Sequence, residues 1–410
     1  MSLSRRDFLK SACAVGAAML SGASAAGGGR RAGGVPDSFR PFKSGYVPPA
    51  FSDFIGCSHV AGRYRLSDAP FLEEGCRRLA RMGFKNVKLW ADSPETSYPS
   101  GAPWNLGEFP SYRDVVSHPR FRSALGEPFE TVALELGFAR SPRGFGGDFA
   151  RFSEADCEEE ARQSEGLASY LLREYADREI TFILQNWEGD WLLRRTFDPS
   201  WESSPPPDLD LRAKGMARWL SARQAGVDTA RASVPGSKCS VFHAVEANRV
   251  LCADSGVPCV ASHVLPEVEC DMVSWSAYDG MAAEKKSAAA TAGGVARGIE
   301  ILRKNCRARL RDGGGNPYVY IGEFGLPENE RAFPREVLRE IYDGFFAACF
   351  FLGLPKAFYW QLYCNEAAAD ASVLMRPGDA CRGFWLVRPD GSPGEAARMF
   401  AEIASGRRGA

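Results

Sequence analysis

Hydrophobic residues along this chain form short continuous runs that alternate with stretches of helical periodicity. The first run, 51–59, predicts a strand and is followed by a helical pattern over 69–83. That pattern ends at Gly83, a residue typical of the C-terminus of a helix. A second strand is predicted at 85–92, and a long stretch rich in Pro, Ser and Gly then leads to a third at 130–138.

The same alternation continues to the C-terminal part of the chain. Helical patterns cover 154–177, 293–310 and 334–353, and the further apolar runs lie at 179–189, 238–246, 270–280, 318–328 and 356–366. Strands that are hydrophobic almost throughout are typical of parallel sheets covered on both faces. Eight such strands with intervening helices predict an α/β fold, a (β/α)₈ TIM barrel over 48–405. A doubly wound open sheet is the alternative, but no G-x-G-x-x-G motif follows an early strand.

The N-terminal residues have a different pattern. Arg5 and Arg6 precede a mildly apolar run, 12–20, and small residues follow at 23–25. This resembles a bacterial twin-arginine signal peptide over 1–26, which implies export by the Tat machinery to the periplasm or the medium. A short basic arm is the alternative. Residues 27–47 predict a linker rich in Gly, Pro and Arg, and no later run reaches the ~20 apolar residues that a stable membrane anchor needs.

Composition excludes some partners. Lys and Arg number 50 and Asp and Glu 51, so no net positive field attracts nucleic acid. Cys13 lies in the predicted signal, which leaves an odd number of cysteines; Cys252 and Cys259 could pair, but the fold is not expected to depend on oxidation. The four histidines show no paired spacing, so neither a metal site nor a cofactor is predicted.

Polar and aromatic residues stand at the ends of several predicted strands. In a (β/α)₈ barrel the C-terminal strand ends meet over one pocket, so these residues are expected to share a site. They are Lys88, Asn186, Glu188, Glu246, Tyr278, Glu323 and Trp360.

Two of these residues, Glu188 and Glu323, end the fourth and seventh predicted strands. Hydrolysis of a glycosidic bond needs one neutral carboxylic acid and one ionised carboxylate across a pocket. Glu188 lies between Trp187 and Trp191, an apolar setting that raises a carboxyl pKa and suits the acid. Glu246 is expected to supply a supporting hydrogen bond.

At these positions the sequence resembles the clan A retaining glycoside hydrolases, (β/α)₈ enzymes that include cellulases and mannanases. The string YIGEFGLPE resembles the segment that carries the nucleophile, which implies this role for Glu323. An Asn–Glu pair ends strand four of that clan, and Glu188 would be its acid/base. The strings VSWSAYD and FYWQ imply substrate-site roles for Tyr278 and Trp360, and FKNVKLW implies one for Lys88 where the clan has Arg.

The chain departs from that pattern at two positions. Asn186 and Glu188 are separated by Trp187, so Asn186 would need a bulge to be re-aimed into the site. Ser276 stands where the clan commonly has His. These differences leave the family within the clan open.

Several tryptophans lie at or near predicted strand ends. Flat aromatic rings stack on sugar rings, so this group predicts a carbohydrate site. We expect a retaining mechanism on β-glycosidic bonds, with the two carboxyl groups ~5–5.5 Å apart. A non-catalytic carbohydrate-binding barrel, or a metal-free hydrolase or lyase acting on another exported polymer, is the alternative. The tryptophans are Trp90, Trp187, Trp191, Trp275 and Trp360.

Overall fold

The computed structural model describes residues 51–101, 103–107, 110–137, 148–198, 202–377 and 380–405. The predicted signal peptide and linker lie outside these residues. Among the helices that are described, none combines the length and the apolar character needed to cross a bilayer.

Eight parallel strands close into a barrel, in the spatial order β1-β10-β9-β7-β5-β4-β3-β2. The predicted (β/α)₈ fold is therefore confirmed, and each barrel strand coincides with one of the eight predicted runs, although β5 extends one residue beyond its run. The strands are β1 (Ile55–His59), β2 (Asn86–Trp90), β3 (Thr131–Glu135), β4 (Thr181–Gln185), β5 (Ser240–Ala247), β7 (Met272–Ser276), β9 (Val319–Phe324) and β10 (Ala357–Tyr359).

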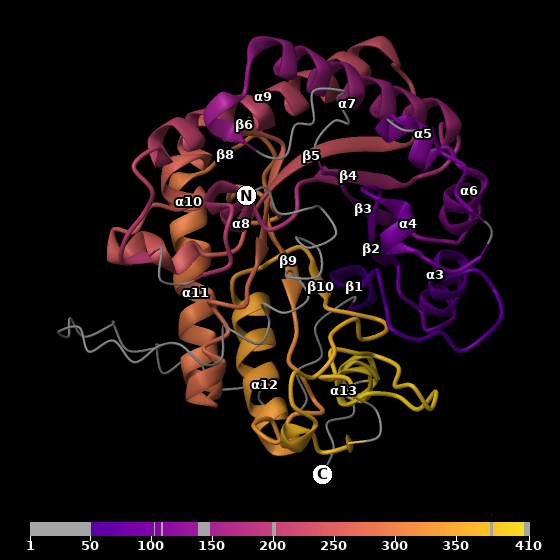
Figure 1. Ribbon diagram of the computed structural model, residues 1–410, viewed down its shortest axis with the longest axis vertical. Coiled ribbons are helices and arrows are strands. Elements are labelled where there is room, and N and C mark those ends of the chain that lie inside the picture. Colours follow the sequence, from indigo (N-terminus) through magenta and orange to yellow (C-terminus); the bar gives the residue numbers. More distant parts are fainter. Residues whose placement is uncertain are drawn as a thin grey trace.

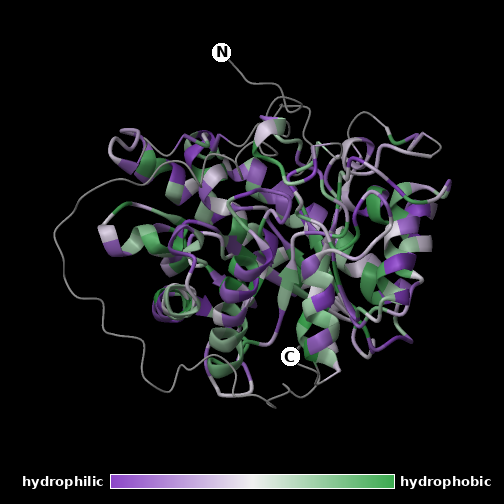
Figure 2. Cartoon of the chain, turned by 90° about the horizontal axis from the view of Figure 1, so that it is seen from below, coloured by the Kyte–Doolittle hydropathy of each residue, from purple (hydrophilic) through white to green (hydrophobic). Residues whose placement is uncertain are grey.

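Helices form a ring around these strands (Figure 1). In Figure 2 the helices carry alternating bands of hydrophilic and hydrophobic residues, as expected where one helix face covers a barrel. The longer helices are α3 (Phe71–Arg81), α7 (Glu154–Glu174), α9 (Leu209–Ser233), α11 (Ala288–Asn305), α12 (Arg335–Phe351) and α13 (Glu395–Ala404). The shorter ones are α2 (Phe51–Phe54), α4 (Pro94–Ser97), α5 (Tyr112–Val116), α6 (Pro119–Leu125), α8 (Gly189–Arg194) and α10 (Val260–His263).

The hydrophobic core has two layers that follow from the alternation of side chains along each strand. Outward-facing residues pack against the helices in one large cluster. Inward-facing residues fill the barrel itself, so that its interior is a packed apolar layer. The interior residues are Ala133, Ile183, Ala244, Met272, Tyr320 and Phe358.

Two local expectations are corrected. Residues 51–54 form helix α2 instead of the start of a strand, because Phe51 and Phe54, three positions apart, both turn toward α12 and pack on Phe346 and Phe350. The run 270–280 is also shorter than predicted, since Cys270 belongs to a separate two-stranded sheet of β6 (Glu269–Cys270) and β8 (Arg307–Ala308).

The cysteines of the described residues are all free thiols. Cys252 and Cys259 are both buried, and no disulfide joins them. The pairing that the sequence left open is therefore not present, and the cohesion of the barrel comes from its apolar core.

Candidate active site

Lys88 lies at the centre of the site, where its side chain enters the barrel from β2 and is completely buried. Its ammonium nitrogen is 3.0 Å from Glu135 Oε2, 3.2 Å from Glu246 Oε2 and 2.9 Å from Glu323 Oε1. One cation thus connects the C-terminal ends of four strands. Burial disfavours the charged form of Lys88, but the carboxylates outweigh this effect and raise its pKa well above the usual value. Lys88 is therefore positively charged.

Glu246, at the end of β5, is fully buried and receives several further hydrogen bonds. Gln185 Nε2 donates to it over 2.9 Å, Ser274 Oγ over 2.6 Å and Ser276 Oγ over 3.1 Å. A Cβ atom at position 322 would lie 2.0 Å from Glu246 Oε2, so only Gly322 leaves room for this carboxylate. These contacts fix Glu246 as a support for the central ammonium group.

Glu323 points into the barrel because the pairing of β7 with β9 changes register. Trp275 pairs with Ile321, but the next residue, Ser276, pairs with Glu323. Side chains alternate between the two faces of a strand, and Tyr320 belongs to the interior. Without the shift Glu323 would face the surrounding helices instead, so this irregularity brings the carboxylate into the site.

Two side chains hold the carboxylate of Glu323 on opposite oxygens. Lys88 contacts Oε1, and the hydroxyl of Tyr278 donates to Oε2 over 3.3 Å. Burial raises the pKa of Glu323 to about 7; Lys88 opposes this increase, whereas the charge of Glu246 adds to it. Glu323 can therefore be ionised near neutral pH, with its orientation fixed from both sides.

Glu188 follows β4 and directly precedes α8, and only 7% of it is exposed. A Cβ atom on the next residue, Gly189, would lie 2.4 Å from the backbone oxygen of Glu246, so the chain turns tightly against β5 here. Burial raises the pKa of Glu188 well above its usual value, the charges of Glu323 and Glu246 add to the increase, and Lys88 opposes it. These effects favour the protonated form of Glu188.

The site contains more carboxyl groups than one cation can balance. We call Lys88, Glu135, Glu188, Glu246 and Glu323 the mouth cluster. Burial raises the pKa of Glu135 well above its usual value despite the contact with Lys88, and its Oε1 atom has no hydrogen-bond partner among the residues that the structure describes. Burial therefore favours the protonated forms of Glu135 and Glu188, and Lys88 supplies the positive charge among the four carboxyl groups.

Three members of the mouth cluster have a geometry that could suit a metal ion. Among the described residues, oxygen atoms of Glu135, Glu246 and Glu323 lie within 4.8 Å of one another. The ammonium group of Lys88 contacts all three carboxylates, so this side chain supplies the positive charge at their centre.

Asn186 is not available to the pocket in the way that the sequence suggested. Its Oδ1 atom accepts a hydrogen bond from the backbone N–H of Glu246, and its Nδ2 group donates to the backbone oxygens of Glu246 and Trp187, each over 3.0 Å. The register between β4 and β5 is regular through the pairing of Gln185 with Ala244, so no bulge re-aims Asn186 within this segment. Its amide instead fastens two neighbouring strand ends together.

Two of the five tryptophans lie beside the mouth cluster. The ring of Trp90 is 5.0 Å from the ammonium nitrogen of Lys88 and meets the ring of Trp360 edge-on at 5.5 Å. Trp360 is partly exposed, and its indole hydrogen-bonds the carboxylate of Glu366. These two rings can therefore form an apolar wall next to the carboxylates.

The other three tryptophans contact residues outside the mouth cluster. Trp187 is partly exposed and Trp191 is buried, and both meet the ring of Phe197 edge-on, at 6.1 and 5.7 Å. Trp275 is fully buried, with its ring so close to Gly298 that a Cβ atom there would be 2.1 Å away. Trp275 faces α11 because its neighbours in β7 face the barrel interior.

Four polar residues of the site were not predicted as site residues, although one of them, Ser276, was noted as a departure from the clan pattern. Each occupies an inward-facing position in its strand, and alternation from the interior residues of the same strand could have identified it. An acidic residue at such a position within an apolar run was a further signal for the first of them. The residues are Glu135, Gln185, Ser274 and Ser276.

No protein-family model matches this sequence, and the curated proteins contain no match to it. Solved structures do match in shape. The Family 1 β-glucosidase from Thermotoga maritima has a TM-score of 0.53 at 12% identity, over 89% of this chain and 99% of that chain. The endo-1,4-β-D-mannanase from Thermotoga petrophila RKU-1 has a TM-score of 0.50 at 15% identity, over 86% and 99%. This chain shares their barrel fold.

Proposed function

We propose that this protein is a retaining glycoside hydrolase that cleaves β-glycosidic bonds of an oligo- or polysaccharide. The observation that carries the proposal is the pair Glu188 and Glu323, which lie just after the fourth barrel strand and at the end of the seventh, within one buried cluster. Their pKa values are both raised, that of Glu188 well above its usual value and that of Glu323 to about 7. One neutral acid beside one carboxylate is the pair that glycoside hydrolysis requires.

In the first step, Glu323 attacks the anomeric carbon and forms a covalent bond to it. The bond from that carbon to the leaving-group oxygen breaks, and Glu188 gives its proton to this oxygen. In the second step, Glu188 takes a proton from water, the water oxygen bonds to the anomeric carbon, and the bond to Glu323 breaks. A separation of ~5–5.5 Å between the two carboxyl groups remains a prediction of this mechanism.

The surrounding residues take supporting roles in this proposal. Lys88 and Tyr278 hold Glu323 in place, and Trp90 and Trp360 offer aromatic faces to a sugar ring. Glu246 acts through Lys88. The two proteins that share this fold are named as a β-glucosidase and an endo-1,4-β-D-mannanase, which supports a β-linked substrate.

The test is a screen of the purified protein with aryl β-glycosides and β-linked polysaccharides, followed by proton NMR of the first product of any active substrate. We expect a product whose anomeric configuration matches that of the substrate. Glu130→Gln is the matched control, since this residue is exposed on the opposite end of the barrel strands. A product of inverted configuration, or unchanged turnover in Glu323→Ala, would contradict the proposal.

We also propose that the protein is exported by the twin-arginine machinery. The support is the sequence around Arg5 and Arg6, with the apolar run and the small residues that follow. Replacing the pair with Lys-Lys should retain the precursor in the cytoplasm, because the receptor recognises the guanidinium pair. Cell fractionation measures this, and normal export of the variant would refute the assignment.

A further inference from the structure

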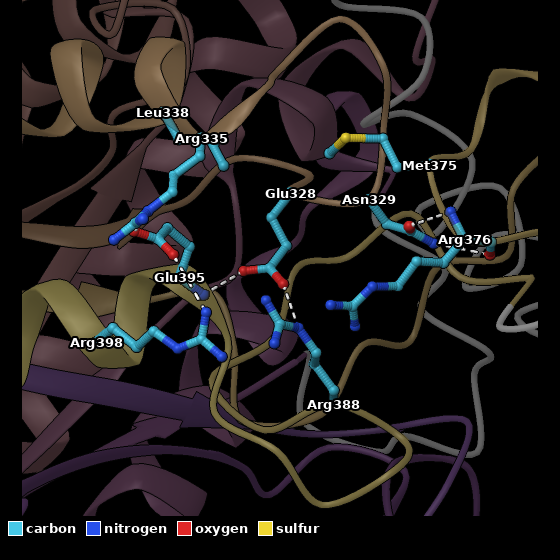
Figure 3. A pocket seen from close by; sticks show the side chains of 9 residues that line it. All are labelled: Glu328, Asn329, Arg335, Leu338, Met375, Arg376, Arg388, Glu395 and Arg398. Atoms are coloured by element: carbon cyan, nitrogen blue, oxygen red, sulfur yellow. Dashed lines mark hydrogen bonds and ion pairs between the residues drawn. The ribbon is translucent and has the colours of Figure 1, made fainter.

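A second site candidate lies outside the mouth cluster, in a pocket of about 200 Å³. The pocket is built by the loop after β9, the first turns of α12 and α13, and the segments before α13 (Figure 3). Its volume is below the ~300–1,000 Å³ of pockets that hold drug-sized ligands, so a small molecule or a single chemical group fits it. The lining residues are Glu328, Asn329, Arg335, Leu338, Met375, Arg376, Arg388, Glu395 and Arg398.

Positive charge exceeds negative charge in this lining. Four of the lining residues are arginines and two are glutamates, which Figure 3 shows grouped around one space. We call this group the arginine pocket. Guanidinium groups are always charged and present a planar set of donors that matches carboxylate and phosphate oxygens. The chemistry of the lining therefore favours an anion.

The two glutamates of the arginine pocket already have partners. Glu328 accepts a hydrogen bond from Arg388 Nε over 2.7 Å and another from the backbone N–H of Glu395. The carboxylate of Glu395 accepts from Arg335 Nε over 2.8 Å and from Arg339 Nε over 2.7 Å. The hydrogen bonds from these arginines help to lower the pKa of Glu395, although burial opposes the shift. Both carboxylates are thus committed to the protein.

Two arginines of the pocket have donors to spare. Arg398 only approaches Glu395, at 3.6 Å, and its side chain is 44% exposed. Within the described part of the chain, the guanidinium group of Arg376 makes neither a hydrogen bond nor an ion pair, and it affects Asp390 only through its charge. Glu328 accepts from the first backbone N–H of α13, that of Glu395, so its carboxylate already occupies this part of the helix N-terminus.

We propose that the arginine pocket binds a small oxyanion, which is either the carboxylate of an acidic sugar or a phosphate or sulfate group. Arg376 and Arg398 supply the charge-assisted hydrogen bonds, and Arg388, buried and fixed by Glu328, forms the floor between them. One lining residue, Glu328, lies five positions after the proposed nucleophile Glu323 in the sequence, on the loop that joins β9 to α12. The proposal stands independently of glycosidase activity.

Isothermal titration of the purified protein tests this inference. Sodium glucuronate, sodium phosphate and sodium sulfate are titrated separately, with sodium chloride at the same ionic strength as the blank, because salt alone screens exposed charges. We expect saturable binding of at least one oxyanion at one site per chain. Tighter binding of glucuronate would identify an acidic sugar as the source of the group, and tighter binding of phosphate or sulfate would identify an inorganic or ester oxyanion.

The variant Arg376→Ala/Arg398→Ala should raise the dissociation constant at least about tenfold. The loss of even one hydrogen bond to a charged group weakens binding by about that factor. Arg81→Ala is the matched control, since Arg81 is also exposed and lies at the end of α3. The Arg81→Ala variant should bind the oxyanion with the affinity of the unmodified protein. Heats equal to the chloride blank for all three anions, or equal binding by the double variant and the unmodified protein, would overturn the proposal.

Discussion

The two ends of the barrel each carry a buried or half-buried charged network, and the networks differ in balance. At the C-terminal end, the mouth cluster sets four carboxyl groups against one ammonium group. At the N-terminal end, Arg231 contacts Asp228 and Asp271, and Arg309 contacts Asp228. We call these four residues the base network. Its acids and bases are equal in number, so every charge has a partner.

The pKa values follow this difference. In the base network, hydrogen bonds from Arg309 and Arg231 lower the pKa of Asp228 although burial opposes them. In the mouth cluster, burial raises the pKa values of Glu188 and Glu323 and Lys88 only moderates the increase. Acids and bases that are equal in number therefore stabilise one another's charges, whereas an excess of buried carboxyl groups favours protonated acids.

The largest effect is expected at Glu323. Glu323→Gln keeps the shape of the side chain but removes the nucleophile, so kcat should fall on the order of 10⁴-fold or more. Initial rates on the substrate found by screening measure this, with Glu130→Gln as the control. Asp271→Asn in the base network should lower stability and leave kcat near its original value. A similar loss of kcat in both variants would remove the functional distinction between the networks.

Glu188→Ala should reduce kcat by about 10²–10⁴-fold on substrates with poor leaving groups, because the proton for the leaving oxygen is lost. Aryl glycosides with good leaving groups need no such proton and should still form the covalent intermediate. Added azide should then restore turnover, since it attacks without a general base. Equal losses on good and poor leaving groups, without recovery in azide, would exclude Glu188 as the acid/base.

Lys88→Met tests the imbalance itself. Removing the cation leaves uncompensated buried carboxylates, so the free energy of unfolding at pH 7 should fall by about 3–5 kcal/mol. A carboxyl group whose pKa is raised in the folded state lowers the stability as the pH rises from its unfolded pKa to its folded pKa. At pH 5 more of these groups are protonated, so the variant should lose less stability there than at pH 7. Urea unfolding at both pH values measures it. Arg231→Met should lower the free energy of unfolding by less, because the side chain of Arg231 is 30% exposed.

The pH dependence of kcat/KM should show an acid limb near pH 7. Glu323 must be ionised to attack and its pKa is raised to about 7, so activity should rise as the pH increases through that value. Glu188 must be protonated, and burial raises its pKa well above the usual value of a glutamate, so activity should fall again on the alkaline side. Lys88→Met should move the acid limb to higher pH, because Lys88 lowers the pKa of Glu323. An acid limb near the ordinary pKa of a glutamate would contradict this assignment.

The fold could be predicted because its signal repeats along the chain. Each barrel strand is a short apolar run, and the runs of 85–92 and 130–138 enclose β2 and β3 with only a few residues to spare. Strand ends were less certain, because their limits depend on tertiary contacts. Helix α2 illustrates this, since Phe51 and Phe54 adopt a helical turn in order to pack on α12.

The sequence predicts which residues of the candidate site lie at strand ends, because this follows from their order along the chain. It does not predict the direction of each side chain. The structure brings Lys88, Glu188 and Glu323 together, as expected from residues at strand ends. Orientation was harder, because it depends on the face of a strand: Trp275 points to the helices although it lies within β7. The register shift that turns Glu323 inward involves pairing between two strands, and no single segment of the sequence encodes it.

The central claim is that the mouth cluster holds a proton on Glu188 while Glu323 gives up its own more readily. It can be tested without a substrate by carbon NMR of protein labelled at the glutamate side-chain carboxyl carbon, titrated through neutral pH. Glu188→Gln and Glu323→Gln would identify the two signals. The account predicts that the signal of Glu188 is still that of a protonated acid at pH 7 and titrates above the signal of Glu323. Ionisation of Glu188 at or below the pKa of Glu323 would contradict it.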